Sequence, residues 1–204
     1  SATEKIKRNE KNKTMLKGVG RQATHVALVA LLWTLLFEFN ETVFAGAQLS
    51  LITNLLFLPA LLRPLAVLLF GGAGVLGLFL GALVTFPVES LSGLSVVIVA
   101  AASSVPAWIA VVIMRRRQRF AAQLGDDLSG LEFNTIVIIA LLCSALNAAA
   151  HYLAFWYVPQ TEHSFAQFAG MLAGDTIGCF LMLSLLSIVL RGLKSWAASE
   201  GTEG

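Results

Sequence analysis

The sequence predicts an all-α integral membrane protein, a bundle of six transmembrane helices with both termini in the cytoplasm. Apolar residues make up 57% of the 204 residues, whereas Lys, Arg, Asp and Glu make up 13%. That charged fraction is about half of the value typical of soluble domains. Mean hydropathy is +0.78, and the charges lie outside long apolar runs. These observations exclude a water-soluble globule.

Six apolar runs define the predicted spans. At about 1.5 Å rise per residue, four of them are comfortably long enough for a hydrocarbon core about 30 Å thick. The first run is marginal in length and the third is short. The predicted spans are residues 24–39, 49–70, 73–86, 91–114, 133–157 and 165–190.

The second and third runs also allow another arrangement. Pro59 and Pro64 interrupt the second run, and Gly71-Gly72 ends it. These features suit a re-entrant pair that enters and leaves the membrane on the outer side, which gives four full spans plus a broken pair. In either arrangement, backbone groups left unpaired at the prolines have to face protein or a wet cavity.

The cations predict the orientation of the chain. Thirteen of the 14 Lys and Arg residues lie before residue 22, between residues 115 and 119, or after residue 190. By the positive-inside rule these segments are cytoplasmic, whereas the outer loops around Glu41, Glu89 and Glu162 contain no Lys or Arg. We therefore expect a basic cytoplasmic tail (1–21), a transmembrane domain (22–190) and a second cytoplasmic tail (191–204). The residues expected to contact lipid headgroups or a protein partner are Arg115, Arg116, Arg117 and Arg119.

Two ionisable residues, Arg63 and Asp175, lie deep within apolar runs. Charges at this depth cost several kcal/mol unless they are paired or hydrated. From the outer ends of their runs, Asp175 is about 15 Å deep and Arg63 about 20 Å deep, and an arginine side chain can span that offset. The sequence therefore predicts an ion pair between the second and sixth helices, which either locks the bundle or forms the centre of a ligand, proton or conformational switch.

A polar stripe marks the fifth run. Cys143, Asn147 and His151 are spaced by four residues and so share one helical face. Such a stripe either hydrogen-bonds to neighbouring helices or lines a binding cavity. In the second case, the candidate ligand-binding residues are Arg63, Asn147, His151 and Asp175.

Glycines at every fourth position favour close helix packing in two runs. The third run contains Gly77 and Gly81, and the sixth contains Gly170, Gly174 and Gly178. Packing within the chain is one interpretation of these helix-packing glycines, and a homodimer seam is the other.

No enzyme motif, cofactor or metal site is predicted. The chain has no phosphate-binding loop, no His-Glu-x-x-His, no Gly-x-Ser-x-Gly and no paired intramembrane aspartates. Ser103 would act as a nucleophile only with His151 as its base, and serines in membrane helices mostly bond to their own turn. Cys143 and Cys179 lack metal-ligand spacing and are expected to be small buried apolar residues. The net charge of +2 gives no evidence for a nucleic-acid partner.

Four segments resemble a known family. Phe57–Ala66, Leu68–Gly71 and Gly77–Ala82 resemble the early part of bacterial membrane-associated sensor domains of the MASE type. Gly174–Gly178 is similar to the Gly-Asp-x-x-Gly step in the last helix of these domains.

The resemblance implies a multi-span bacterial inner-membrane module that perceives a small or membrane-borne signal. In that family the module is usually fused to a cytoplasmic diguanylate cyclase or histidine kinase. Pro59, Arg63 and Asp175 are the candidate signal-site positions that the resemblance carries over.

We therefore expect a sensory or regulatory module that binds a ligand and signals to a separate protein partner in the membrane or cytoplasm. One alternative is a small-molecule-binding component of a transport system. Another is a structural accessory subunit of a larger membrane complex.

Overall fold

Helices make up most of the described chain. The computed structural model describes residues 2–44, 46, 48–50, 53–86, 93–124, 132–158 and 164–200. It describes the side chains of residues 15–44, 46, 55–86, 93–124, 132–158 and 164–189. The helices are α1 (Ala2–Val43), η2 (Leu58–Leu61), α2 (Leu62–Phe70), α3 (Gly72–Thr85), α4 (Gly93–Arg115), α5 (Gln118–Ala121), α6 (Phe133–Ala154) and α7 (Phe165–Glu200). The strands are β1 (Gln48–Ser50) and β2 (Thr53–Asn54), which pair antiparallel.

The described chain is mostly helical, as predicted, and four of its helices are long and apolar enough to cross a membrane. They lie within α1, α4, α6 and α7. Two shorter apolar helices, Leu58–Phe70 and Gly72–Thr85, occupy the second and third predicted spans. The candidate spans are Met15–Val43, Gly93–Arg115, Phe133–Ala154 and Phe165–Val189.

The second predicted span, 49–70, is wrong in its first half. The chain there forms the short strands β1 and β2, and the helix begins only at Leu58. Phe57 has extended backbone angles (φ −129°, ψ 91°) before a single 3₁₀ turn that contains Pro59. Because Pro64 has no N–H to donate to the carbonyl of Ala60, regular α-helical bonding starts after this turn.

Gly71 joins α2 to α3 through a tight turn. Its backbone has φ +57° and ψ −127°, angles that side-chain-bearing residues rarely adopt. The next turn of α3 places Gly74 against the backbone of Ala66, where a Cβ would overlap the carbonyl group. The two short helices therefore form a closely packed hairpin.

Helix α1 continues beyond both ends of the first predicted span. It forms a single helix of 42 residues. The first predicted span ends at residue 39, but the next residue, Asn40, is only 1% exposed. Its Oδ1 accepts a hydrogen bond from the backbone N–H of Leu58 at 2.9 Å. Asn40 therefore supplies a hydrogen-bond acceptor for the first backbone N–H of η2. A residue near the end of α1 can reach this N–H only because the chain folds back beside α1.

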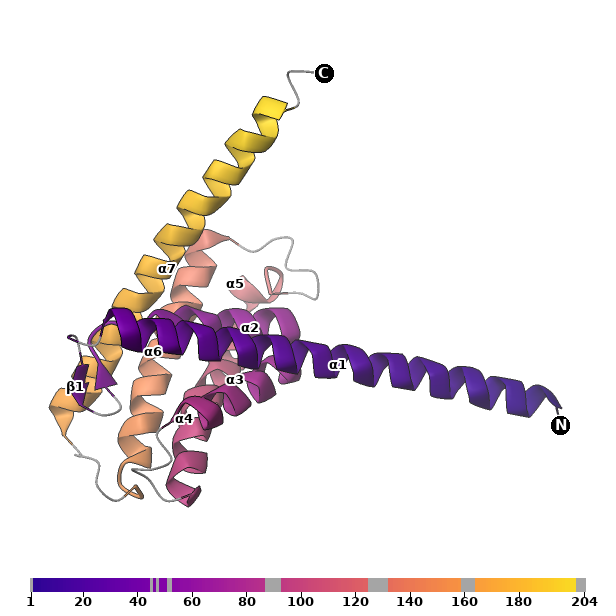
Figure 1. Ribbon diagram of the computed structural model, residues 1–204, viewed down its shortest axis with the longest axis horizontal. Coiled ribbons are helices and arrows are strands. Elements are labelled where there is room, and N and C mark those ends of the chain that lie inside the picture. The colour runs from indigo at the N-terminus through magenta and orange to yellow at the C-terminus, as the bar shows by residue number, and fades with distance from the viewer. Residues whose placement is uncertain are drawn as a thin grey trace.

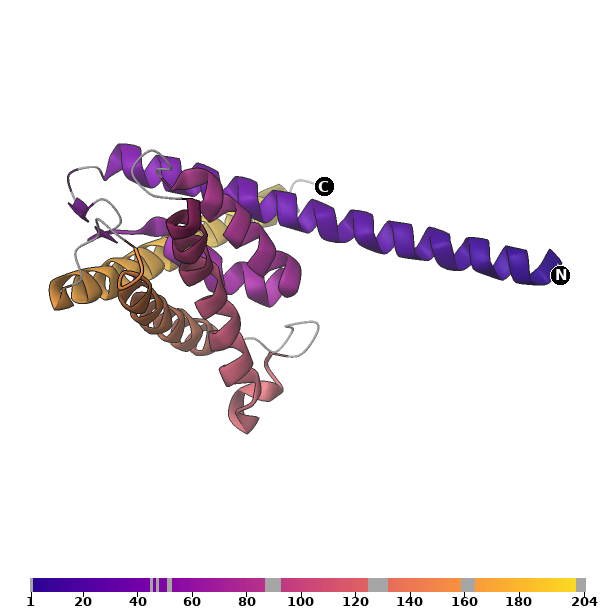
Figure 2. The same ribbon diagram turned by 90° about the horizontal axis from the view of Figure 1, so that it is seen from below.

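The α2–α3 hairpin lies at the centre of the molecule (Figure 1). Helix α3 contacts α1 and α4, whereas α2 contacts α3, α4 and α6. Helix α1 runs along the long axis of the molecule, and α6 and α7 cross its direction. The view from below shows the N-terminal part of α1 extending away from the other helices (Figure 2).

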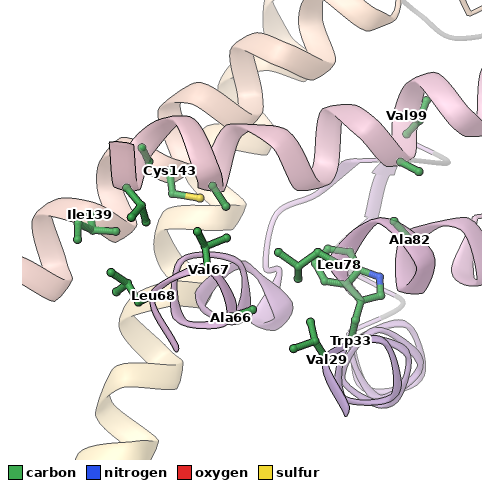
Figure 3. Packing of buried hydrophobic residues seen from close by; sticks show 14 of the residues in the cluster. Val29, Trp33, Ala66, Val67, Leu68, Leu78, Ala82, Val99, Ile139 and Cys143 are labelled. Carbon is green, nitrogen blue, oxygen red and sulfur yellow. The ribbon is translucent and has the colours of Figure 1, made fainter. Parts of the chain in front are cut away.

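The apolar core extends from α1 across the hairpin to α4 and α6. Figure 3 shows Val29 and Trp33 of α1 directed toward Leu78 and Ala82 of α3. These four side chains are at most 1% exposed. The indole Nε1 of Trp33 donates to Thr85 Oγ1 at 3.1 Å, so this large buried side chain also satisfies its polar atom.

Candidate functional site

Arg63 and Asp175 form the predicted ion pair. Arg63 Nη1 lies 2.8 Å from Asp175 Oδ2, and the two side chains are 4% and 2% exposed. Arg63 is in the first turn of α2, and Asp175 is near the middle of the apolar part of α7. The structure therefore confirms that the second and sixth apolar runs meet through these two charges.

Backbone contacts hold the start of the hairpin against α7. The N–H of Phe57 donates to the carbonyl of Gly174 at 3.2 Å. Gly178, one turn further along α7, packs so closely on the Phe57 carbonyl that a Cβ would overlap it. The absence of a side chain at Gly178 thus allows the extended segment to approach the helix. This approach places Arg63 within reach of Asp175.

Asn147 of α6 completes a three-residue cluster with Arg63 and Asp175. Its Nδ2 donates to Asp175 Oδ2 at 2.7 Å, the same oxygen that Arg63 contacts. Asn147 is fully buried. Two donors on one carboxylate oxygen compensate part of the cost of removing the charge from water. The cluster connects α2, α6 and α7 and is called the Arg63–Asn147–Asp175 cluster below.

His151 lies beside this cluster and not within it. Its Nδ1 is 3.0 Å from the backbone carbonyl of Asn147, and its Nε2 is 3.2 Å from Ser103 Oγ. Because a carbonyl can only accept, the first contact places the ring proton on Nδ1, and Nε2 then accepts from the Ser103 hydroxyl. Three of the four candidate ligand-binding residues are therefore in direct contact, and the fourth is linked through the backbone of Asn147.

Two aromatic rings that the sequence analysis did not assign to the site lie against Arg63. Its Cζ is 5.3 Å from the centroid of the Trp33 ring and 5.0 Å from that of Phe57. Both distances allow cation–π attraction, which is stronger where water is excluded. No spacing pattern identified Trp33, because it lies in a different apolar run. Phe57 is inside the family-like segment but carries no polar group that would single it out.

Two polar atoms of the cluster have no hydrogen-bond partner among the described residues. They are Nε of Arg63, a donor, and Oδ1 of Asn147, an acceptor. Both belong to side chains that bond to the same oxygen of Asp175. The cluster thus has one free donor and one free acceptor in a buried position.

The predicted small-residue positions of α3 contact other parts of the same chain. A Cβ on Gly77 would lie 2.6 Å from Val29 Cβ, and one on Gly81 would lie 2.8 Å from Trp33 Cβ. Both positions therefore serve close packing of α3 on α1. The predicted positions of α7, all buried, are Gly170, Gly174 and Gly178.

The basic segment between α4 and α6 is exposed. Its four arginines, Arg115, Arg116, Arg117 and Arg119, lie on the surface, with the guanidinium of Arg119 over the Phe120 ring. A hydrogen bond between Thr135 and Gln123 holds the following turn against the start of α6. The predicted outer loops at Glu89 and Glu162, and the tail side chains before Met15 and after Val189, lie outside the described residues.

Cys143 and Cys179 are both free and buried, as expected for small apolar positions. The described part of the chain contains no group of three or more His, Cys, Asp or Glu residues arranged to hold a metal ion. A groove of about 290 Å³ between α6 and α7 is lined by Phe133, Phe180, Leu183, Ser184, Ser187 and Ile188. None of the candidate ligand-binding residues lines this groove.

No protein-family model, curated protein or solved structure matches the chain. The functional interpretation therefore depends on the geometry of the described residues.

Proposed function

We propose that this chain is a sensory or regulatory module of a bacterial inner membrane, related to the MASE-type sensor domains. In this proposal, a small or membrane-borne ligand binds at the Arg63–Asn147–Asp175 cluster, with His151 adjacent, and the change is passed to a separate protein partner. The single observation that carries the proposal is the buried ion pair between α2, a helix of nine residues, and α7.

The position of this ion pair favours a regulatory role. A buried pair is weak evidence for stability, because apolar residues of similar volume are often as stabilising. Ionisable groups at membrane depth instead commonly mark functional sites. Here the pair attaches the α2–α3 hairpin to α7, so a ligand that bonds to a residue of the cluster changes how the hairpin packs on that helix. Two arrangements with different ligand affinity are what a sensor requires.

We also propose the membrane topology that this function uses. Helices α1, α4, α6 and α7 span the bilayer with both termini in the cytoplasm, and the α2–α3 hairpin enters and leaves from the outer side. At about 1.5 Å per residue, α3 with its 14 residues reaches about 21 Å, less than the hydrocarbon core. This topology places the exposed Arg115–Arg119 segment on the cytoplasmic side, where it contacts anionic headgroups or the partner.

A second candidate function is a substrate-binding component of a transport system. The specific observation in its favour is the non-helical backbone at Phe57, which bonds to Gly174 next to the buried charges. Broken helices with polar groups near the middle of the membrane are typical of transporter binding sites.

One experiment separates these functions. Benzoylphenylalanine in place of Arg116 would cross-link a partner of the basic segment to this chain in bacterial membranes on illumination. The cross-linking is compared between the chain that keeps Asp175 and the Asp175→Asn variant. The matched control is Ser184→Ala, because the Ser184 hydroxyl is exposed and donates to the Phe180 carbonyl of its own turn. A sensor predicts that Asp175→Asn changes the yield of the captured partner or its activity, whereas Ser184→Ala does not.

Uptake of a labelled solute into vesicles that contain the chain and its partner, lost in Asp175→Asn, would instead support transport. An unchanged partner complex with unchanged activity in Asp175→Asn would contradict the sensory proposal and leave a structural subunit.

A further inference from the structure

The free donor and the free acceptor of the Arg63–Asn147–Asp175 cluster constrain the chemistry of the ligand. Arg63 is 4% exposed and Asn147 is fully buried, so bulk water does not satisfy Arg63 Nε or Asn147 Oδ1. Leaving such buried atoms unbonded costs free energy that folded proteins usually avoid. A molecule that bonds to both atoms recovers this cost when it binds.

Arg63 Nε and Asn147 Oδ1 are held in place because another nitrogen of each side chain bonds to Asp175. Arg63 uses Nη1, and Asn147 uses Nδ2, to bond to the same oxygen of Asp175. The guanidinium also lies against the Trp33 and Phe57 rings, at 5.3 and 5.0 Å from its Cζ. Because the N–H bonds of arginine lie in the plane of the guanidinium, the remaining approach to Nε is along that plane. The binding groups are therefore largely preorganised.

The charge balance of the cluster excludes an ion as the preferred ligand. Arg63 and Asp175 compensate each other at 2.8 Å, and Asn147 is neutral. An additional charge in this buried position would have no counter-charge and would carry the full desolvation cost. An uncharged molecule avoids that cost and can still offer both an acceptor and a donor.

We infer that the cluster binds a small uncharged molecule through an amide or hydroxyl group. The oxygen of that group accepts from Arg63 Nε–H, and its N–H or O–H donates to Asn147 Oδ1. This inference rests on the ligand site of the proposed function. It specifies a neutral ligand that forms hydrogen bonds with both Arg63 Nε and Asn147 Oδ1. The Arg63–Asp175 ion pair stays closed when this ligand binds.

The test uses two fluorinated probes of nearly equal size, trifluoroacetamide and trifluoroacetate, with the purified full chain in lipid nanodiscs. Binding is followed by the fluorine NMR signal as probe concentration rises. Arg63→Lys is the matched variant, because lysine keeps the charge beside Asp175 but has no Nε–H at that position. Asn147→Leu removes the acceptor, and Ser184→Ala serves as the control outside the site. Each variant is first checked for an unchanged size-exclusion profile.

We expect saturable binding of trifluoroacetamide, weakened about tenfold or more in Arg63→Lys because a bond to a charged donor is lost. Asn147→Leu should weaken binding as well, and Ser184→Ala should not. Trifluoroacetate should bind far more weakly to every form. Equal trifluoroacetamide binding in all variants, or no saturable binding, would overturn the inference.

Tighter binding of trifluoroacetate, sensitive to Arg63→Lys, would also overturn the uncharged class while leaving a ligand site in place. That outcome separates a failure of this inference from a failure of the proposed function, which the partner-capture experiment with Asp175→Asn tests independently.

Discussion

The hairpin formed by α2 and α3 has two faces that are held by different forces. On one side, α3 packs against α1 through glycines and apolar side chains, with Gly77 on Val29 and Gly81 on Trp33. On the other side, the start of the hairpin is held to α7 by an ion pair and a backbone hydrogen bond at Phe57. The first contact depends on shape, whereas the second depends on polar groups at membrane depth.

This difference indicates which contact can change during function. Lipid tails are as apolar as these side chains, so the hydrophobic effect does not drive α1 and α3 together in a membrane. The α1–α3 contact therefore depends on van der Waals fit. The α2–α7 contact contains groups that a polar ligand can compete for or bridge. In the proposed function, α1 with α3 is therefore the fixed side of the hairpin, and α7 is the side that responds to a ligand.

The largest effect is expected at the ion pair. Arg63→Gln or Asp175→Asn alone leaves the other charge buried without its partner, which should lower the free energy of unfolding by about 3–5 kcal/mol. Denaturation by SDS in mixed micelles measures this change. A loss below about 1 kcal/mol in both variants would mean that the pair does not hold α2 to α7.

Close packing of the extended segment should give the next largest effect. Gly178→Ala places a Cβ against the Phe57 carbonyl, and we expect a loss of about 1–3 kcal/mol in unfolding free energy from overpacking. Gly72→Ala is the matched control, because a Cβ there meets nothing within 4 Å. Equal stability of the two variants in SDS denaturation would contradict this close approach.

A smaller effect is expected at His151. Ser103→Ala removes the hydroxyl that lies 3.2 Å from His151 Nε2 and leaves that nitrogen buried without its partner. The expected loss is about 1–2 kcal/mol. Ser184→Ala, whose exposed hydroxyl bonds to its own turn, should change stability by less than about 0.5 kcal/mol. Thermal unfolding of both variants in nanodiscs measures which one loses more stability. A larger loss in Ser184→Ala than in Ser103→Ala would contradict this prediction.

The smallest effect is expected on the apolar side of the hairpin. Thr85→Val removes the acceptor of the Trp33 indole at 3.1 Å while keeping the volume of the side chain. Because this bond is only partly buried, we expect a loss of about 0.5–1 kcal/mol. Unfolding of Thr85→Val is measured together with Arg63→Gln and Asp175→Asn, and a larger loss in Thr85→Val than in either of these would contradict the comparison between the faces.

The sequence predicted the ion pair because little else at membrane depth could compensate either charge. Arg63 and Asp175 stand in apolar runs, and counting residues from the outer ends placed them within reach of each other. The four-residue spacing likewise placed Asn147 on a buried face with Cys143 and His151. These inferences depend on depth and helical periodicity, which are local properties of the chain.

Contacts that depend on the path of non-helical backbone could not be predicted in this way. The strands before Leu58 replace half of an expected helix, and their position lets Asn40 bond to Leu58 and Phe57 bond to Gly174. Apolar composition alone does not distinguish an extended segment packed on protein from a spanning helix. Trp33 likewise reaches Arg63 only through the tertiary arrangement of α1 beside the hairpin.

A double-mutant cycle on Arg63 and Asp175 tests the central claim most directly. Arg63→Met, Asp175→Leu and the double variant are compared with the unmodified chain by SDS denaturation. If the charges hold α2 to α7 as a pair, the double variant is destabilised by at least about 2 kcal/mol less than the sum of the single variants. Losses that add to within about 0.5 kcal/mol would show that the two residues act independently and would contradict the account.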